Sequence, residues 1–340
     1  MKTGSTNDSQ TDNRLRLVQQ ELCNCCGQQR WQKLYTNYDY DGKKTPTYDI
    51  YQCLNCGLIV TERDNRPEKI SSYYPKTYTA YQENKSLRKQ HLKIFLYFLL
   101  RSPVPTPVRW LREFVFYPIS QRMRGFEIKP QAKVLDIGCG SGKFLSVIKA
   151  LKMIPFGVEV NEKACELSKR ITEDIYLGPF ETIGNYKFSN NPAMKFELIF
   201  ASAVMCQVMD PAQVLQNVKR MLADNGTAII TAANNRSLWA KLFGRYWYNL
   251  ETPRNLSIFA PQNMQMYCDK CQLKIKKIRF RTVSTNGVAF SLIHLFEDKW
   301  QLSRRWRRLF TLFSPVLWPL LLLVQLLKLG DSAEYHLIHK

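Results

Sequence analysis

Short apolar runs alternate with amphipathic stretches through the second half of the chain. Five of these runs are predicted β-strands: 134–137, 156–159, 175–178, 196–201 and 227–232. Helices are expected between them, and a turn at 222–226 is expected to open the fifth strand. Further strands are expected at 272–284 and 334–340. This alternation predicts a parallel, doubly wound α/β sheet, whose ligands bind beyond the carboxyl ends of its strands.

A glycine-rich turn follows the first predicted strand. The sequence Val-Leu-Asp-Ile-Gly-Cys-Gly-Ser-Gly at 134–142 leads into a helix expected to begin near Lys143. Glycine lets a ligand approach the main chain, and the free N–H groups of the helix start face that ligand. The next strand ends at Glu159, whose carboxylate is suited to bind two vicinal ribose hydroxyls. The glycine spacing is G-x-G-x-G, whereas a dinucleotide site prefers G-x-G-x-x-G.

Two C-x-x-C-G pairs near the N-terminus predict a structural zinc site. The predicted ligands are Cys23, Cys26, Cys53 and Cys56. Four thiolates close a tetrahedral site, and Cys25, inside the first pair, is expected to stay off the metal. Alternating aromatic and polar residues between the pairs fit the short strands of a zinc ribbon. The alternatives are four unrelated thiols or a redox dithiol, although no thioredoxin-like βαβ pattern surrounds either pair.

Between the ribbon and the glycine loop, the sequence is aromatic and then apolar. Residues 70–81 hold four tyrosines around one proline, and form either a packing loop or part of an acceptor pocket. Residues 85–128 mix apolar and aromatic side chains with arginines, and prolines break the helical pattern. This segment is either a covering helical layer or a membrane-facing surface.

A long apolar run lies near the C-terminus. Residues 309–327 contain no charge, and an arginine cluster at 304–308 precedes them. Two prolines interrupt the run, and a strand of the sheet is expected to follow it. A helical hairpin that dips into one leaflet is therefore favoured over a single crossing, and an ordinary buried helix pair is the alternative.

Charge and cysteine content limit the environment. Lys and Arg number 49 against 28 Asp and Glu, a net charge of +21 over 340 residues. This surplus predicts an anionic partner: nucleic acid, acidic lipid or a phosphorylated substrate. Residues 1–14 are polar, with no signal peptide or anchor pattern. Without a secretory signal, the 10 cysteines indicate metal binding in a reducing compartment.

The glycine loop and the acidic strand end resemble the first two signature motifs of class I S-adenosylmethionine-dependent methyltransferases. The resemblance covers about 133–280 and the cysteine pairs. It is greatest to bacterial members with a zinc ribbon in front, which often serve cell-surface glycan or natural-product pathways. It implies a mostly parallel seven-stranded sheet with an apolar helical insertion before the last strand. The implied cofactor-binding residues are Asp136, Gly138, Gly140, Gly142, Glu159, Phe180, Ala201 and Ser202.

Two departures from this family each remove an imidazole. The chain has Asn255 where the family usually has His, and Cys206-Gln207 where it usually has Glu-His. Histidine is the side chain best suited to act as a base near neutral pH. The candidate catalytic residues are Tyr73, Tyr74, Tyr78, Glu251 and Arg254. Alternatively, the acceptor needs only alignment with the activated methyl group, or the chain binds the cofactor without catalysis.

The predicted organisation has six segments. These are a tail at 1–18, a zinc ribbon at 19–66, an aromatic and helical segment at 67–130, a Rossmann-like domain at 131–286, a helical hairpin at 287–330 and a final strand at 331–340.

The favoured function is methyl transfer from S-adenosylmethionine to a small or lipid-linked acceptor, such as a sugar or glycan precursor. The expected place is a cytoplasmic one, peripheral or monotopic at an anionic inner membrane face. The alternatives are an RNA methyltransferase and a non-catalytic membrane-associated module. The basic residues cluster beside apolar runs and do not form the interleaved basic and aromatic groove of a nucleic-acid binder. The pattern fixes no oligomeric state.

Overall fold

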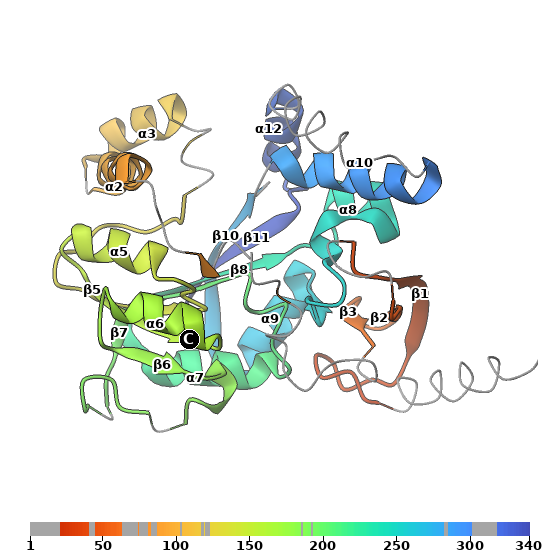
Figure 1. The fold of residues 1–340 in the computed structure, drawn as a ribbon, viewed down its shortest axis with the longest axis horizontal. Helices are drawn as coiled ribbons and strands as arrows, with labels where there is room; N and C mark the ends of the chain where they lie inside the picture. Colours follow the sequence, from red (N-terminus) through yellow and green to blue (C-terminus); the bar gives the residue numbers. More distant parts are fainter. Residues whose placement is uncertain are drawn as a thin grey trace, which may run out of the picture.

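A seven-stranded sheet organises the molecule (Figure 1). The computed structural model describes residues 21–40, 45–62, 74, 81–82, 87–102, 104–116, 119, 123–184, 186–191, 193–281, 285–300 and 318–340. The strands are β4 (Lys133–Ile137), β5 (Ile154–Glu159), β6 (Ile175–Leu177), β7 (Phe196–Ser202), β8 (Leu222–Ala233), β10 (Leu273–Arg281) and β11 (Ser332–His339). Their order is β10-β11-β8-β7-β4-β5-β6, and β11 runs antiparallel to both neighbours. This arrangement confirms the predicted mostly parallel α/β sheet.

Helices cover both faces of the sheet. They are α5 (Lys143–Ala150), α6 (Glu162–Lys169), α7 (Pro211–Met221) and α9 (Pro261–Lys270). The side chains of α5 pack in one hydrophobic cluster and those of α7 and α9 in another, as expected of a doubly wound sheet. Local sequence fixes where α6 and α7 begin. The Asn161 side chain accepts the N–H of Ala164, and the Asp210 carboxylate accepts two N–H groups in front of Pro211.

The predicted turn at 222–226 is wrong. Strand β8 already begins at Leu222, which pairs with Phe196 of β7, and the next paired residue is Thr227, opposite Leu198. The intervening residues bulge out of the ladder and do not end it. The reason is that Leu222 is fully buried, so its apolar contacts keep the chain at the sheet despite the Asp-Asn-Gly sequence.

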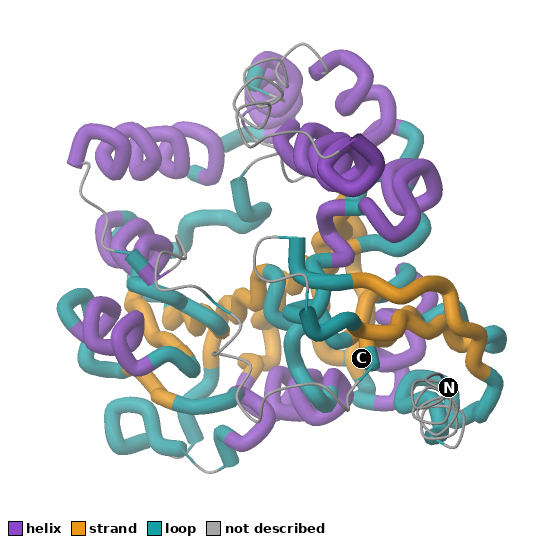
Figure 2. The backbone as a smooth tube through the Cα atoms, turned by 45° about the vertical axis from the view of Figure 1, so that its right-hand side comes forward, coloured by secondary structure: helices purple, strands orange, loops and turns teal. Residues whose placement is uncertain are grey.

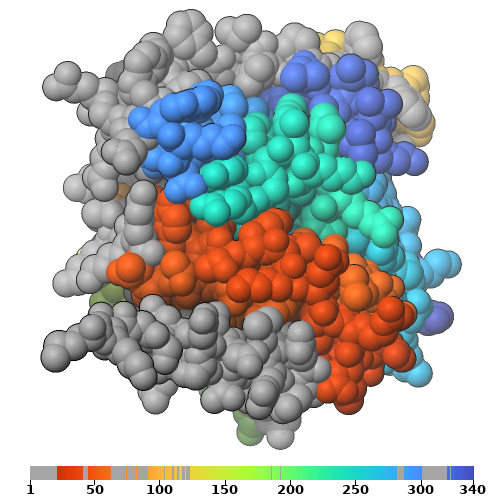
Figure 3. All heavy atoms as spheres, turned by 90° about the vertical axis from the view of Figure 1, so that its right-hand side faces the viewer, coloured from red at the N-terminus to blue at the C-terminus, as the bar shows by residue number. Residues whose placement is uncertain are grey.

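The cysteine-rich segment forms a small antiparallel sheet that continues into the rest of the molecule. Its strands are β1 (Trp31–Asn37), β2 (Tyr48–Cys53) and β3 (Ile59–Thr61). Strand β3 pairs with β9 (Ser257–Ile258), which lies just before α9. Figure 3 shows this segment as a band against the atoms of α8 (Leu238–Phe243) and α10 (Thr285–Trp300). The cysteine-rich segment therefore shares a small sheet with β9, and it shares hydrophobic clusters with the part of the chain that forms the seven-stranded sheet and its helices.

Further helices gather at one end of the molecule (Figures 1 and 2). They are α2 (Leu87–Arg101), α3 (Thr106–Val115), α10 and α12 (Trp318–Leu326). The Arg112 guanidinium of α3 donates to the carbonyls of Leu99 and Ser102 and so satisfies the C-terminal end of α2. Within the described ranges, the structure has no helix with the length and apolar character needed to cross a membrane. Residues 304–308 and the first part of the apolar run, 309–317, lie outside the described residues.

Candidate functional site

The glycine loop lies at the carboxyl end of β4, where it joins α5. Gly138, Gly140 and Gly142 all have positive φ, at 72°, 56° and 77°. A Cβ at Gly138 would stand 2.7 Å from Val204 Cγ2, and one at Gly142 would stand 2.5 Å from Ile171 Cδ1. The loop therefore needs glycine both for its conformation and for its close packing. Gly138 is exposed, whereas Gly140, Ser141 and Gly142 are buried, so a ligand would meet this loop at Gly138.

Glu159 is held rigidly beside this loop. One carboxylate oxygen accepts the N–H of Gly140 at 2.7 Å, and the other accepts the N–H groups of Val160 and Asn161, each at 2.9 Å. Burial raises the pKa of Glu159, while these backbone donors favour the charged form. Glu159 thus closes the loop and orients its carboxylate at the ligand-binding edge of the sheet.

Asp136 forms an ion pair that sequence reasoning missed. Its carboxylate lies 2.6 Å from an Arg124 amine, and Asp136 is almost fully buried. Burial raises the pKa of Asp136, and the Arg124 charge opposes that rise. The Arg124 guanidinium also stands 3.8 Å from the centre of the Phe144 ring. The segment before β4 therefore brings a cation to Asp136; in the sequence, Arg124 is one of several arginines among aromatic residues, and no pattern singles it out.

The remaining predicted cofactor residues have different environments. Ala201 lies beside Ile137 in the sheet, and Ser202 pairs with Thr231, so both stand next to the glycine loop. The Phe180 side chain is buried in the main hydrophobic cluster, while its carbonyl accepts the Asn217 side-chain amide at 2.9 Å. Phe180 thus anchors the 180–182 turn through packing. Adenine contact at this turn stays a prediction.

This edge fits the chemistry of S-adenosylmethionine. The molecule carries an ammonium, a carboxylate, a sulfonium and two ribose hydroxyls. Asp136 and Glu159 would supply carboxylates for the cationic and hydroxyl groups, Arg124 would supply a cation for the carboxylate, and the glycine loop would meet the ligand at its exposed Gly138. When bound, the sulfonium offers a methyl group already activated for in-line attack by a nucleophile.

The four predicted zinc ligands come together. The sulfur atoms of Cys23, Cys26, Cys53 and Cys56 all lie within 4.8 Å of one another. The Cys23–Cys56 and Cys26–Cys53 sulfurs are 3.7 and 3.6 Å apart, close to the ~3.8 Å edge of a tetrahedron with Zn–S bonds of about 2.3 Å. Both C-x-x-C-G pairs form the same turn, because the N–H groups of Gly27 and Gly57 donate to the carbonyls of Cys23 and Cys53. The set fits a closed structural zinc site.

Cys25 lies outside this cluster. It is fully buried, and its sulfur stands 3.8 Å from the Asn263 carbonyl and 4.0 Å from the Met266 sulfur. Both partners belong to α9. Cys25 therefore packs the first C-x-x-C-G pair against α9.

The two positions that lack the family histidine lie next to each other. The Cys206 carbonyl accepts the N–H of Leu256 at 2.6 Å and that of Ser257 at 3.1 Å. The Asn255 amide donates to the Asn249 carbonyl at 2.9 Å and so supports the loop's own shape. Burial raises the pKa of the Cys206 thiol to about 12, so the thiol stays protonated at neutral pH.

The candidate catalytic residues are only partly brought together. Arg254 is buried in a bidentate ion pair with Asp39 of the ribbon, at 3.0 and 3.1 Å, and its Nε lies 3.3 Å from Glu251. Glu251 has φ of 43° and acts electrostatically on Cys206. Tyr74 packs its ring edge-on against Tyr81. Tyr73 and Tyr78 lie outside the described residues.

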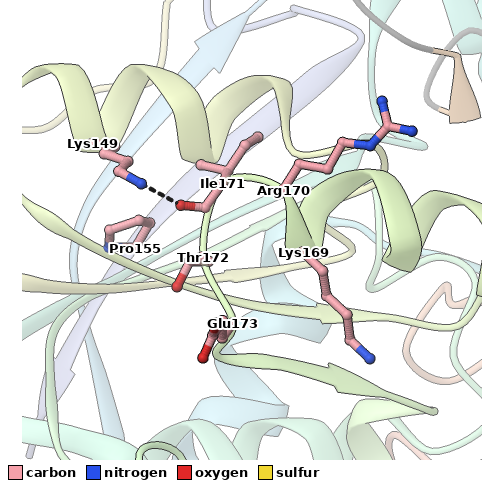
Figure 4. A pocket seen from close by; sticks show the side chains of 7 residues that line it. All are labelled: Lys149, Pro155, Lys169, Arg170, Ile171, Thr172 and Glu173. Atoms are coloured by element: carbon pink, nitrogen blue, oxygen red, sulfur yellow. Dashed lines mark hydrogen bonds between the residues drawn. The ribbon is translucent and has the colours of Figure 1, made fainter.

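A cavity of about 380 Å³ lies at the opposite edge of the sheet (Figure 4). Its lining includes Lys149, Lys169 and Arg170, and the Lys149 amine donates to the Ile171 carbonyl. These cations stand at the C-terminal ends of α5 and α6, where they stabilise the helix dipoles. The cavity therefore belongs to the amino edge of the sheet and not to the ligand-binding edge.

Fold and site together define a class I S-adenosylmethionine-dependent methyltransferase domain. Residues 109–277 match the family model described as "Methyltransferase domain". The protein is an S-adenosylmethionine-dependent methyltransferase.

Curated relatives agree with this class. A "Ubiquinone biosynthesis O-methyltransferase" of Haemophilus ducreyi is 22% identical over 184 residues, which cover 51% of this chain and 77% of the relative. The protein of that name from Bradyrhizobium diazoefficiens is 22% identical over 58% of this chain and 77% of its own length. A solved structure of a putative sarcosine dimethylglycine methyltransferase from Galdieria sulphuraria is 12% identical, with a TM-score of 0.42 and coverage of 73% of this chain and 96% of that one.

Proposed function

We propose that the protein methylates a small or lipid-linked acceptor, such as a sugar or glycan precursor, at an anionic membrane surface. The observation that carries the proposal is a set of apolar side chains that three helices expose to solvent. Soluble monomers rarely expose contiguous apolar patches without a function, and membrane or partner contact is the usual one.

Each of these helices presents a stripe at helical spacing. On α2 the exposed side chains are Leu92, Phe95 and Phe98; on α3 they are Val108, Leu111 and Val115; on α12 they are Leu320, Leu323 and Leu326, and the exposed Leu327 directly follows α12. Leu111 and Leu326 are 65% and 64% exposed. The opposite side of α12 is buried, since Leu321 and Val324 pack in the core. Figures 1 and 3 show α2, α3 and α12 at the same end of the molecule.

The net charge of the whole chain supports an anionic partner. The net charge of +21 favours an anionic bilayer, where each lysine or arginine near the surface contributes about 1 kcal/mol. Apolar insertion adds about 0.8 kcal/mol per buried methylene. A few inserted leucines plus a few basic residues are enough for reversible binding.

The names of the relatives suggest the methylated atom. They are O-methyltransferases, which supports an oxygen acceptor for this chain as well. Their link to ubiquinone biosynthesis makes intermediates of that route a second candidate class of acceptor.

Transfer of a labelled methyl group tests the proposal. The protein is incubated with methyl-labelled S-adenosylmethionine and with a membrane lipid extract, an aqueous metabolite extract or total RNA. We expect label in the lipid or small-molecule fraction, and none with Glu159→Ala. Label confined to RNA would contradict the proposed acceptor class.

Vesicle sedimentation tests the surface. Leu111→Glu and Leu326→Glu should each weaken binding to vesicles of phosphatidylglycerol and phosphatidylcholine. Ile154→Glu is the matched control, because Ile154 is 36% exposed but lies at the amino end of β5. Equal binding by all three variants would exclude this helical surface as the membrane contact.

A further inference from the structure

We infer that His294 of α10 supplies the imidazole that positions 207 and 255 lack, and that it accepts the acceptor's proton in a small polar cavity beside Glu251. The inference rests on the proposed oxygen acceptor. It concerns a residue that lies almost forty positions beyond the family's motif positions, on the helical insertion.

The insertion brings His294 to the loop that carries Glu251. The Ser291 hydroxyl of α10 accepts the N–H of Tyr248 at 2.9 Å, and the Phe290 ring stacks on the Tyr248 ring at 5.1 Å. His294 follows one turn later on the same side of α10, with its ring centre 6.2 Å from that of Tyr248. His294 is 5% exposed, so this insertion holds its imidazole inside the protein.

The ribbon contacts the His294 ring through Tyr40. The Tyr40 ring stacks on the His294 ring at 4.2 Å with an interplanar angle of 11°. In Figure 3 the atoms of α10 border those of the ribbon. Three segments that are distant in sequence therefore meet at one imidazole: the ribbon, the 247–254 loop and the insertion.

A cavity of about 10 Å³ lies among these segments. Its lining includes His294, Tyr40, Asn37, Glu251, Thr252 and Arg254. This volume admits about one water molecule, or one hydroxyl group of a ligand. A base reaches a proton either directly or through one water, so the cavity has the size that such a transfer requires.

The cavity is connected to the cofactor edge through one loop. Val204 is the side chain that a Cβ at Gly138 would strike, and the Val204 carbonyl accepts the N–H of Gln207. In the same turn, the Cys206 carbonyl accepts the N–H of Leu256. Burial raises the pKa of the Cys206 thiol, and the charge of Glu251 adds to this rise. Hydrogen bonds of Cys206 thus join the 204–207 turn, which packs against Gly138, to the segment that directly follows the cavity-lining residues 247–254.

The other titratable groups around the ring leave the imidazole as the base. Burial raises the pKa of Tyr40 to about 12, so this phenol stays protonated at neutral pH. Glu251 and Arg254 line the same cavity as His294, and Arg254 is paired with both Glu251 and Asp39. Tyr248 packs beside the ring, and Asp298, one turn further along α10, binds Tyr38, Arg245 and Tyr246.

In the proposed step, the acceptor oxygen forms a bond to the methyl carbon while the bond between that carbon and the sulfonium sulfur breaks. The electron pair of the broken bond stays on sulfur, which leaves as a neutral thioether. The hydroxyl proton passes to the neutral imidazole of His294, directly or through the cavity water, and Glu251 stabilises the imidazolium. Release of that proton to solvent restores the base.

The experiment compares His294→Gln and His294→Ala with His339→Gln. His339 contacts the Leu222 carbonyl at the amino edge of the sheet, and the chain has four histidines in all. Methyl transfer to the acceptor fraction is measured against pH, and S-adenosylhomocysteine affinity is measured by calorimetry. We expect both His294 variants to lose about 10²–10⁴-fold in rate at unchanged affinity, with His339→Gln unaffected.

Two readouts separate a base from a structural role. The wild-type rate should fall as pH drops through the imidazole pKa, ordinarily about 6.5, and His294→Gln should lack this fall. Added imidazole should restore part of the rate of His294→Ala. A His294 variant with the wild-type rate and pH profile would overturn the inference. Absence of transfer by the wild-type protein to any fraction would instead overturn the proposed function.

Discussion

A single carboxylate shows how this protein builds a cofactor site from its own backbone. Glu159 accepts three backbone N–H groups before any ligand arrives. A carboxylate has about four acceptor positions in all, so two ribose hydroxyls would have to share or displace one of these donors. The site is therefore pre-formed, and ligand binding adjusts it.

Replacing Glu159 should remove cofactor binding. Hydrogen bonds to a charged group contribute about 1.5–3 kcal/mol each, so loss of two predicts at least a 100-fold weaker affinity of Glu159→Ala for S-adenosylhomocysteine. Isothermal titration calorimetry measures this change. Glu173→Ala is the control, because Glu173 lines the cavity at the amino edge. An unchanged affinity of Glu159→Ala would remove the main support for the cofactor site.

A pair of glycines separates steric fit from backbone strain. Gly138 and Gly244 have φ of 72° and 51°, but a Cβ at Gly138 would meet Val204, whereas one at Gly244 meets nothing within 4 Å. Gly244 also has ψ of −119°, a conformation that other residues rarely adopt, so Gly244→Ala should cost backbone strain alone, about 1–3 kcal/mol. Gly138→Ala should lower the melting temperature further and weaken cofactor binding. Thermal unfolding of the two variants, with and without S-adenosylhomocysteine, gives the comparison.

At the scale of elements, one buried carboxylate stabilises the last strand in the sheet. Glu334 of β11 contacts Arg279 and Arg281 of β10 at 3.1 and 2.8 Å, and His336 at 3.1 Å. Although burial raises it, the His336 hydrogen bond and the two arginines lower the pKa of Glu334 to about 2. The carboxylate therefore links two strands that α10 and α12 separate in the sequence.

Acid unfolding tests this network. A lowered native pKa gives stability that is present above the unfolded value of 4.5 and is lost as pH falls from about 4.5 towards 2. Glu334→Gln should be less stable by about 3–5 kcal/mol at neutral pH, because it leaves buried arginines without their charge partner. It should also lack the corresponding pH dependence. Urea unfolding at several pH values would show this, and parallel curves for both proteins would contradict it.

Elements with a local signal could be predicted from the sequence. The β4 and β5 strands, the glycine turn and the paired cysteines each depend on neighbours within a few residues. The errors and omissions involve long-range contacts. Leu222 is drawn into β8 by Phe196, which lies 26 positions earlier. Likewise, Arg124 is recognisable as part of the site only once the chain has brought it to Asp136. Local pattern carries no information on such pairs.

At the scale of the whole molecule, the ribbon contacts the 251–256 loop, on which the inferred acceptor site depends. Strand β3 pairs with β9, the Thr61 hydroxyl donates to the Asn255 carbonyl at 2.7 Å, and Asp39 holds Arg254. The cofactor edge, in contrast, is built by β4, β5 and the glycine loop, with no ribbon residue among the contacts described for it. Metal binding and cofactor binding should therefore be separable.

Two adjacent cysteines allow that separation to be tested. Cys26 is in the sulfur cluster, whereas Cys25 packs on α9. Structural zinc contributes about 10–16 kcal/mol to small domains, so Cys26→Ser should lose the metal and the ribbon fold, while Cys25→Ser should keep one zinc per chain. Because the ribbon braces the 251–256 loop, Cys26→Ser should lose methyl transfer yet bind S-adenosylhomocysteine nearly as the wild type does. Zinc content, S-adenosylhomocysteine affinity by calorimetry and labelled methyl transfer are measured on the same preparations. Equal zinc loss in both variants would refute the assignment of the zinc ligands. A loss of cofactor affinity in Cys26→Ser that parallels its loss of zinc would show that the ribbon supports the entire fold.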